Sequence, residues 1–259
     1  MWYGFPSFSR LQTDNIIPAN VLLTSLAAYD KIYITKCGEA GKPLRNSERD
    51  EIEMAERREL MLNTGFRVFS EKGIEAVSMQ EVADTCRLGI ATLYRYFNTK
   101  LIFVIAVAVK KWEEYFREIE AEYDRRGGEM MNAAEEMDFY LSAYITLYRE
   151  HADILRFNQN FNGYIVHESP TKEQLQDYMY VISLFSNKFH RLYEKGQKDG
   201  SIRTDESEQT MFNTTMHIML AVCGRYAQGV VVRGENAPED LTKELMILKR
   251  MIMAQYCRV

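Results

Sequence analysis

The sequence predicts an all-α protein, and three observations lead to that class. No segment alternates apolar and polar residues over several positions, as a half-buried strand would. Only five prolines and fourteen glycines interrupt the 259 residues. After residue 46, apolar residues recur at helical spacing in successive segments that are bounded by glycines or by Ser-x-x-acid starts. This pattern corresponds to about nine helices without an internal repeat.

The composition excludes several classes of protein. Apolar residues make up 46% and charged residues 27%, which is usual for a soluble globular chain. The formal charge of −5 argues against a protein that coats nucleic acid over its whole surface, although it allows one basic patch. The longest apolar run, residues 101–109, is much shorter than the ~20 residues of a membrane-spanning helix, so we expect no membrane span.

The cysteines predict a reducing compartment. Cys37, Cys86, Cys223 and Cys257 are scattered along the chain and form no Cys-x-x-Cys pair. The chain also starts without the basic segment and continuous apolar core of a secretory signal. We therefore expect free thiols in a cytoplasmic protein.

Composition changes along the chain predict three regions. Residues 1–46 contain few acidic residues, many aromatics and three of the five prolines. Few apolar residues repeat there, so we expect a poorly ordered extension, with an arm that contacts DNA or a partner as the alternative. Residues 47–98 are predicted to form a three-helix domain with a helix-turn-helix, and residues 99–259 a larger helical domain.

The segment that begins at Ser78 predicts two short helices joined by a tight bend. Ser78 and Glu81 have the spacing of a capping box, in which each side chain binds the other residue's backbone N–H. Gly89 interrupts the first apolar face, and residues 90–96 restart a helix. The preceding helix, which Gly73 ends, supplies the core that so short a pair lacks. Three helices with the third exposed are a DNA-binding architecture.

This stretch resembles the DNA-binding signature of the tetracycline-repressor (TetR) family of transcriptional regulators. The resemblance covers about residues 57–104 and rests on Gly73, Ser78-x-x-x-Val82-Ala83 and Thr92-Leu93-Tyr94-x-Tyr96-Phe97-x-x-Lys100. It implies that the second short helix enters a DNA groove and that the rest of the chain is a variable ligand domain. The chain departs from the family at the turn, where Arg87 and Gly89 replace the usual glycine and small polar residue.

The basic residues near this signature support DNA binding, because most affinity for DNA comes from neutralised phosphates. No acidic residue occurs between Thr85 and Trp112, whereas five basic residues do: Arg87, Arg95, Lys100, Lys110 and Lys111. The side chains expected to contact DNA are Ser78, Gln80, Arg87, Thr92, Tyr94, Arg95, Tyr96 and Lys100. Tyr96 and Lys100 are expected at the phosphates, whereas Leu93 and Phe97 are expected in the core.

The last two predicted helices, about residues 205–229 and 238–256, carry apolar faces. By the resemblance they form a two-fold dimer that binds a palindromic operator. Some of their apolar residues must instead belong to the core of one chain. The set is Met211, Met216, Met219, Leu220, Val222, Met246, Ile247, Met251 and Ile252.

The middle of the chain is rich in large rings and is the candidate ligand region. One helix is predicted over residues 129–157, a break at Asn162-Gly163, and another helix from Pro170. Rings at helical spacing form either ordinary core or the wall of a cavity, and buried tyrosine hydroxyls need partners in both cases. The candidates are Tyr140, Tyr144, Tyr148, Phe157, Phe161 and Tyr178.

No motif for an enzyme, metal or cofactor stands out. The chain has no GxSxG, P-loop or dinucleotide fingerprint, and its histidines form no His-x-x-x-His pair. A metal site would require His151, His167, His190 or His217 to meet other ligands in three dimensions. The sequence favours a repressor that a small-molecule inducer releases from DNA. The alternative is a helical ligand-binding or scaffold protein without DNA binding.

Overall fold

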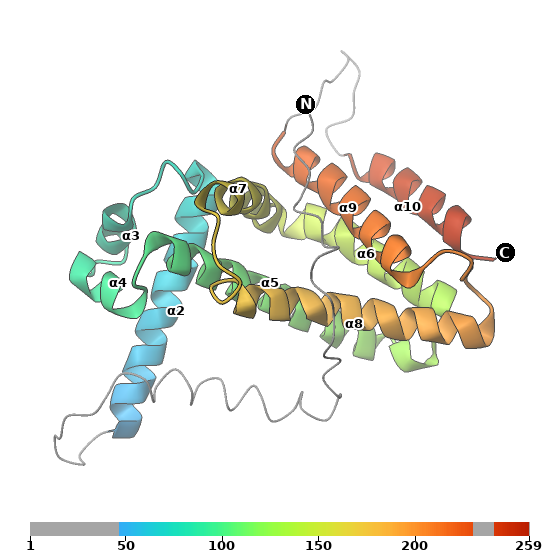
Figure 1. Cartoon of the computed structure of the whole chain (residues 1–259), viewed down its shortest axis with the longest axis horizontal. Helices are drawn as coiled ribbons and strands as arrows, with labels where there is room; N and C mark the ends of the chain where they lie inside the picture. Colours follow the sequence, from blue (N-terminus) through green and yellow to red (C-terminus); the bar gives the residue numbers. More distant parts are fainter. Residues whose placement is uncertain (1–46, 230–240, 259) are drawn as a thin grey trace. The chain divides into compact units, whose positions relative to one another are not determined.

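The computed structural model describes residues 47–229 and 241–258. In this part of the chain it contains nine α-helices, a 3₁₀ turn and an isolated β-bridge, so the all-α prediction is confirmed. The elements, drawn in Figure 1, are α2 (Ser47–Lys72), α3 (Met79–Thr85), α4 (Ile90–Tyr96), α5 (Lys100–Arg125), η3 (Gly128–Met130), α6 (Ala133–Glu150), α7 (Ala152–Glu168), α8 (Gln176–Asp199), α9 (Glu208–Ala227) and α10 (Thr242–Tyr256).

Contacts divide the chain into two units, residues 1–50 and 51–259, and the features below belong to the second. The predicted extension, residues 1–46, lies outside the described residues, and the boundary predicted at residue 98 stays a prediction. Within the described part, no single helix is long and apolar enough to cross a membrane. Helices α4 and α5, bent by 66°, meet the length and composition criteria only as a pair.

Local signals set the ends of α2 and α3. Gly73 follows the last residue of α2, as predicted. Its φ of 85° is a left-handed backbone conformation that glycine adopts without strain and that would strain a residue with a side chain. The Ser78 hydroxyl accepts a hydrogen bond from the Glu81 N–H at 3.1 Å and caps α3. The predicted capping box is only half right: the Glu81 carboxylate accepts a hydrogen bond from the Lys72 ammonium at 2.6 Å instead. This ion pair ties the end of α2 to the start of α3.

The turn between α3 and α4 contains a residue with a left-handed backbone. Arg87 has φ of 56°, and the Leu88 N–H returns to the Ala83 carbonyl at 2.9 Å. Gly89 is extended and is the N-cap of α4 without a side-chain cap. The left-handed conformation therefore falls on the arginine and not on the glycine beside it. Such a conformation costs a residue with a Cβ about 1–2 kcal/mol.

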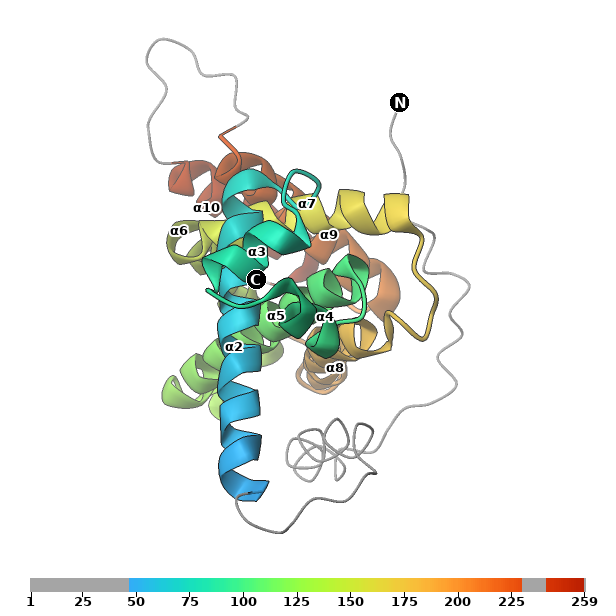
Figure 2. The same cartoon turned by 90° about the vertical axis from the view of Figure 1, so that its left-hand side faces the viewer.

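A shared aromatic core supports the short helices. Phe97 packs its ring 4.8 Å from that of Phe103, which lies 5.8 Å from the ring of Phe69. Gly65 allows this approach, because a Cβ there would lie 2.5 Å from the Phe103 ring. Figure 2 looks onto α3 and α4, with α2 running beside them. Helix α5 supplies Phe103 and so forms one core with α2 and α4.

The remaining helices form a bundle, in which α5 packs along α8, and α6 contacts α7, α8, α9 and α10. The prediction of one helix over residues 129–157 is wrong. Two helices, α6 and α7, cover most of this stretch, and they meet at His151, whose φ of −130° and ψ of 41° are not helical. A capping box from Asn132 and Glu135 starts α6. Helix α7 runs through Gly163, so the break predicted there is wrong too, and α8 begins six residues after Pro170, at Gln176.

Candidate nucleic-acid interface and ligand region

Helix α4 has one face in the core and one exposed. Leu93 is completely buried, as predicted, whereas the neighbouring Tyr94 is 43% exposed. Arg95 is exposed and Thr92 is half-buried. An exposed helix that presents an aromatic ring, an arginine and a hydroxyl offers both hydrogen-bond donors and flat surface to a DNA groove.

Several of the side chains predicted to contact DNA already contact other groups of the protein. The Arg95 guanidinium lies 6.0 Å from the centre of the Tyr96 ring, so these two side chains meet on the protein itself. The Ser78 hydroxyl caps α3, and the Gln80 amide donates to the Asp84 carboxylate at 2.7 Å. Gln80 is exposed, yet it lies beside a carboxylate of its own helix. Tyr94 and Arg95 are exposed on α4, whereas Gln80 is exposed but hydrogen-bonded to Asp84.

Arg87 is exposed at the turn, and its guanidinium has no ion pair within the described residues. The left-handed backbone directs this side chain away from the path that a helical residue would take. A phosphate is a suitable partner for an exposed arginine at the edge of a helix-turn-helix. The structure therefore leaves Arg87 accessible for the role predicted from the sequence.

Lys100 and the two lysines further along α5 are engaged with the protein. The Lys100 ammonium lies 5.6 Å from the centre of the Tyr164 ring of α7, and its partial burial lowers its pKa. Lys110 forms ion pairs with Glu59 of α2 and Glu114 of α5. Lys111 pairs with Glu114 at 2.7 Å. The acid-free segment seen in the sequence therefore receives carboxylates from outside it, and its positive charge is smaller than its composition suggests.

The six predicted ligand residues lie in three separate places. Phe157, Phe161 and Tyr178 form a continuous stack, with ring centres 5.9 and 4.9 Å apart. Tyr140 lies against the Tyr123 and Phe139 rings. Tyr148 meets Tyr226 of α9, and the Tyr144 carbonyl accepts a hydrogen bond from the Cys223 thiol at 3.5 Å. Their assignment to one ligand pocket stays a prediction.

An open groove of about 480 Å³ lies between α5 and α6, and the sequence analysis did not predict it. Its apolar wall includes Tyr115, Ile119, Phe139 and Ala143, and its polar rim includes the carboxylates of Glu118 and Glu150. None of the six predicted ligand residues lines it. The groove is formed by residues far apart in the sequence, which explains why spacing along one helix could not predict it.

The described cysteines are free thiols, as expected, and Cys37 lies outside the described residues. Burial raises the pKa of Cys223 to about 12 and that of Cys257 to about 11. A thiol with so high a pKa is a poor nucleophile near neutral pH. Cys223 lies in the hydrophobic core, and Cys257 packs against it.

Comparison with known proteins agrees with the geometry. Residues 61–107 match the family model of bacterial regulatory proteins of the tetR family. Residues 61–107 are therefore a DNA-binding region of the TetR type. The family is one of transcriptional regulators, in agreement with the expectation that the chain is not an enzyme.

Curated relatives match a third of the chain or less. The transcriptional repressor KstR of Mycobacterium tuberculosis is 34% identical over 82 residues, which are 32% of this chain and 36% of the relative. KstR of Rhodococcus jostii is 34% identical over 58 residues, 22% of this chain and 27% of the relative. The match thus spans about a third of the length of these relatives, or less.

Solved structures resemble the chain over a larger part of its length. The fatty acid degradation regulator FadR of Bacillus halodurans aligns over 76% of this chain and 94% of its own, with a TM-score of 0.59 and 14% identity. A transcriptional regulator of Saccharomonospora viridis in complex with choline aligns over 79% of this chain and 100% of its own, with a TM-score of 0.62 and 16% identity. At this identity the likeness concerns the fold: an N-terminal helix-turn-helix domain followed by a helical domain.

Proposed function

We propose that the chain is a ligand-responsive transcriptional regulator that binds a palindromic operator as a homodimer and is released by a small-molecule inducer. The observation that carries the proposal is helix α4, which buries Leu93 and exposes Tyr94 and Arg95. A short helix held by an aromatic core on one side and accessible on the other is suited to insertion into the major groove. Repression is the proposed outcome, because an operator-bound dimer excludes other proteins from that DNA.

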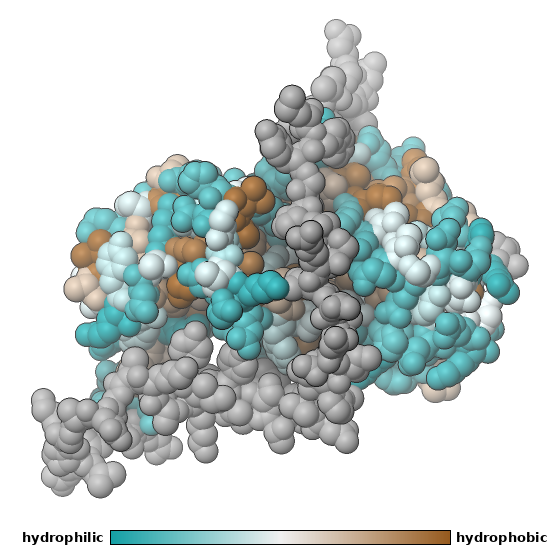
Figure 3. Space-filling model, in the orientation of Figure 1, coloured by the Kyte–Doolittle hydropathy of each residue, from teal (hydrophilic) through white to brown (hydrophobic). Residues whose placement is uncertain are grey.

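The proposed dimer contact lies on α9 and α10. Met246, Ile247 and Met251 are 46%, 42% and 64% exposed, which is unusual for large apolar side chains at neighbouring positions. Figure 3 shows apolar surface over these two helices. Other members of the predicted set are core residues of one chain: Met211, Met219 and Ile252. Met216, Leu220 and Val222 are half-buried and lie at the margin of the proposed interface.

A packed route connects the proposed DNA-binding helices with the ligand domain. The Phe66 ring of α2 lies 5.6 Å from that of Phe157 on α7, and the stack continues through Phe161 to Tyr178 of α8. Lys100, at the start of α5, contacts Tyr164 of α7. A ligand that moved α7 would therefore disturb both α2 and α5. Such a ligand controls DNA binding only if it binds the two arrangements with different affinity.

The inducer is proposed to bind in the ligand domain, and its chemical class needs a direct search. The similar structures carry names that refer to different molecules: fatty acid degradation for one, choline for another. A thermal-shift screen should therefore include fatty acyl compounds, choline and small apolar compounds. A ligand that raises the melting temperature should also lower DNA affinity, because the two effects are reciprocal for an inducer.

The direct test is a fluorescence anisotropy titration with the DNA upstream of the protein's own gene, over a series of salt concentrations. The parent protein should bind with a sequence preference and with an affinity that falls as salt rises. Tyr94→Ala should weaken specific binding by about 1–3 kcal/mol, the usual value of a lost base contact. Lys100→Ala should weaken binding too, although the loss of its contact with Tyr164 contributes to the effect.

Arg203→Ala is the matched control, because it removes an exposed positive charge outside the proposed interface, where Arg203 pairs with Asp205 at 2.5 Å. This variant should bind DNA like the parent. Equal binding by Tyr94→Ala and the parent, with both proteins dimeric, would place the contact surface elsewhere. Binding that ignores both sequence and salt would contradict a regulator.

The second candidate function is a helical ligand-binding or scaffold protein that does not bind DNA. The left-handed Arg87 in the turn favours it, because an ordinary helix-turn-helix would be strained by that residue. The same titration separates the two functions. A folded dimer that binds a small molecule in the thermal-shift screen but binds no DNA would support this alternative.

A further inference from the structure

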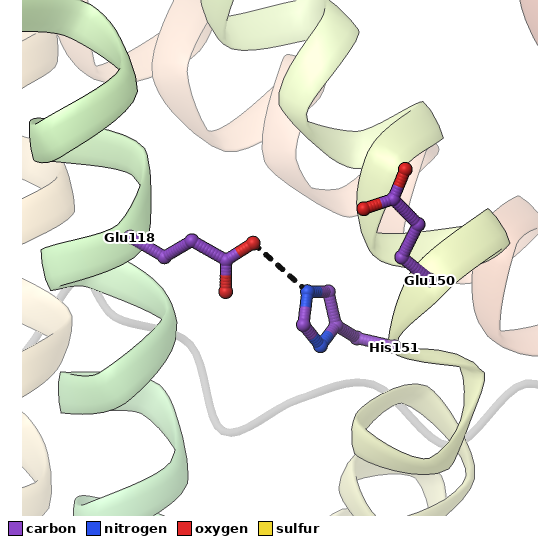
Figure 4. A group of neighbouring side chains, drawn as sticks. All are labelled: Glu118, Glu150 and His151. Atoms are coloured by element: carbon purple, nitrogen blue, oxygen red, sulfur yellow. Dashed lines mark hydrogen bonds and ion pairs between the residues drawn. The ribbon is translucent and has the colours of Figure 1, made fainter.

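Three side chains that could hold a cation meet beside the groove between α5 and α6. They are Glu118 of α5, Glu150 at the end of α6 and His151 between α6 and α7. One ligand atom from each lies within 4.8 Å of the other two. Figure 4 shows Glu118 reaching from one helix toward the His151 ring, with Glu150 on the opposite side. Two carboxylates and an imidazole, from α5 and from the junction of α6 and α7, thus converge on one small volume.

The histidine is held in place by its position in the fold. The His151 N–H donates to the Leu147 carbonyl at 3.1 Å, and its own carbonyl accepts from the Ile154 N–H at 3.0 Å. The edge of the ring meets the Tyr115 ring, with centres 5.5 Å apart. The Tyr115 hydroxyl in turn donates to the Ala143 carbonyl at 2.5 Å. A ligand side chain oriented by neighbours loses little freedom when a metal binds.

A second histidine with two carboxylates provides a comparison. His190 has Glu208 at 2.9 Å from Nδ1 and Glu194 at 3.7 Å from Nε2. Because these nitrogens lie on opposite sides of the ring, the two carboxylates cannot share one cation with it. At His151, by contrast, Nε2 lies 3.0 Å from Glu118, and Glu150 faces the same region. Among the residues that the structure describes, only the His151 group brings three candidate ligand atoms within 4.8 Å of one another.

We propose that Glu118, Glu150 and His151 bind a divalent first-row transition metal ion, with Zn²⁺ as the first probe. Imidazole nitrogen favours zinc and its neighbours over magnesium and calcium, while the carboxylates neutralise the charge. The site is formed by groups that are partly exposed and can rotate, so small rotations bring the ligand atoms to bonding distance. Three protein ligands leave at least one coordination position for water or for a molecule in the groove.

A metal at this site would join α5 to the junction of α6 and α7. Helix α5 begins at Lys100, directly after the short helix α4, so the ion would hold the far half of the helix that follows the proposed recognition helix. Binding to the folded chain alone stabilises it in proportion to the logarithm of the metal concentration. The inference goes beyond the proposed function, because the ion would bind whether or not the chain binds DNA.

The test is isothermal titration calorimetry on the full, untagged protein after treatment with a chelator, with ZnCl₂, MnCl₂ and MgCl₂ as separate titrants. We expect one Zn²⁺ per chain and weaker binding of Mg²⁺. His151→Ala should lower zinc affinity by about tenfold or more, and Glu118→Gln and Glu150→Gln should each lower it as well. Circular dichroism should confirm that the three variants keep their helix content.

The matched control is His190→Ala, which also removes a histidine beside two carboxylates and should leave zinc affinity unchanged. A Cys257→Ser variant checks for binding through the least buried described thiol and should bind zinc like the parent. Visible spectra of the Co²⁺ complex should show nitrogen and oxygen ligation without a thiolate band. No zinc binding, a thiolate band, or equal affinities for His151→Ala and the parent would overturn the proposal.

Discussion

Helices α4 and α10 both leave large side chains exposed, but the chemistry of the two surfaces is opposite. Helix α4 presents Tyr94 and Arg95, which combine rings with hydrogen-bond donors. Helix α10 presents Met246, Ile247 and Met251, which can neither donate nor accept a strong hydrogen bond. The first surface is suited to a polar, charged partner, and the second to an apolar one such as another copy of the same helix. The type of side chain on each surface thus indicates the class of partner that we propose for it.

The two surfaces also rest on different cores. Leu93 and Phe97 hold α4 against Phe103 of α5. Leu245 and Ile252 hold α10 against the rest of the bundle. Each surface can therefore be changed, or its support removed, without touching the exposed residues of the other. This independence makes the comparison open to test by single substitutions.

The largest effect is expected for Phe103→Ala. The ring is completely buried among Phe69, Phe97 and Gly65, and its loss leaves a cavity, so the free energy of unfolding should fall by about 3–5 kcal/mol. DNA binding should fall with it, because α4 loses its support. Urea unfolding and anisotropy measure the two quantities. Leu245→Ala, in the other core, should also destabilise, by about 2–5 kcal/mol, but it should affect dimerisation first.

A smaller effect, on association alone, is expected for Met251→Glu. Met251 is 64% exposed, so the change should alter the stability of the single chain by less than about 0.5 kcal/mol. In the proposed dimer it would bury a charge, and the dissociation constant should rise about tenfold or more, which corresponds to ~1.4 kcal/mol. Analytical ultracentrifugation over a concentration series measures this. An unchanged dimer would move the interface away from α10.

Arg87→Gly tests the polar surface with a change of about 1 kcal/mol. Glycine adopts φ of 56° without strain, so relief of strain should raise the free energy of unfolding by about 1 kcal/mol. The greater entropy of glycine in the unfolded chain opposes part of this gain. If Arg87 contacts a phosphate, the slope of log affinity against log salt should also decrease by about 1. Arg87→Ala separates the effects, because it removes the charge and keeps the strain. Greater stability with unchanged DNA binding would show that the arginine is tolerated rather than used.

The sequence predicted α2 to α4 well because their signals are local. A glycine at the end of α2, a serine cap on α3 and a glycine N-cap on α4 each act within a few residues, and the structure places all three as expected. The break at His151 left no such signal, because histidine is neither a strong cap nor a helix breaker. The second half of the capping box failed because Lys72, from another helix, competes for the Glu81 carboxylate.

Sites formed by several helices were out of reach of sequence reasoning. Spacing identified many rings in the middle of the chain, but it could not show that Phe157, Phe161 and Tyr178 stack together while Tyr140 packs elsewhere. The groove and the group around His151 depend on how α5 lies against α6. The same limit applies to charge: Lys110 follows an acid-free run in the sequence, yet it pairs with Glu59, 51 positions away.

The smallest expected effect on stability concerns His190. This exposed residue of α8 belongs to neither of the two surfaces. A hydrogen bond to Glu208 at 2.9 Å raises the pKa of His190 above its usual value of 6.5, with Glu194 adding to the effect and Arg191 opposing it. A raised pKa means that the folded chain binds the proton more tightly than the unfolded chain. The stabilisation is therefore fully present below pH 6.5 and is lost as the pH rises through the folded-state pKa.

We expect His190→Gln to lower the free energy of unfolding at pH 6 but not at pH 8. The difference should be less than about 0.5 kcal/mol, because ion pairs between exposed side chains are weak and screened by salt. Urea unfolding at both pH values measures it. Glu208→Gln should remove the same pH dependence, and the double variant should show no further loss, since both changes break one interaction. If the free energy of unfolding of Glu208→Gln kept the pH dependence of the parent, another titrating group would be responsible for it. Because His190 is away from α4 and α10, DNA binding and dimerisation should be unchanged in all of these variants.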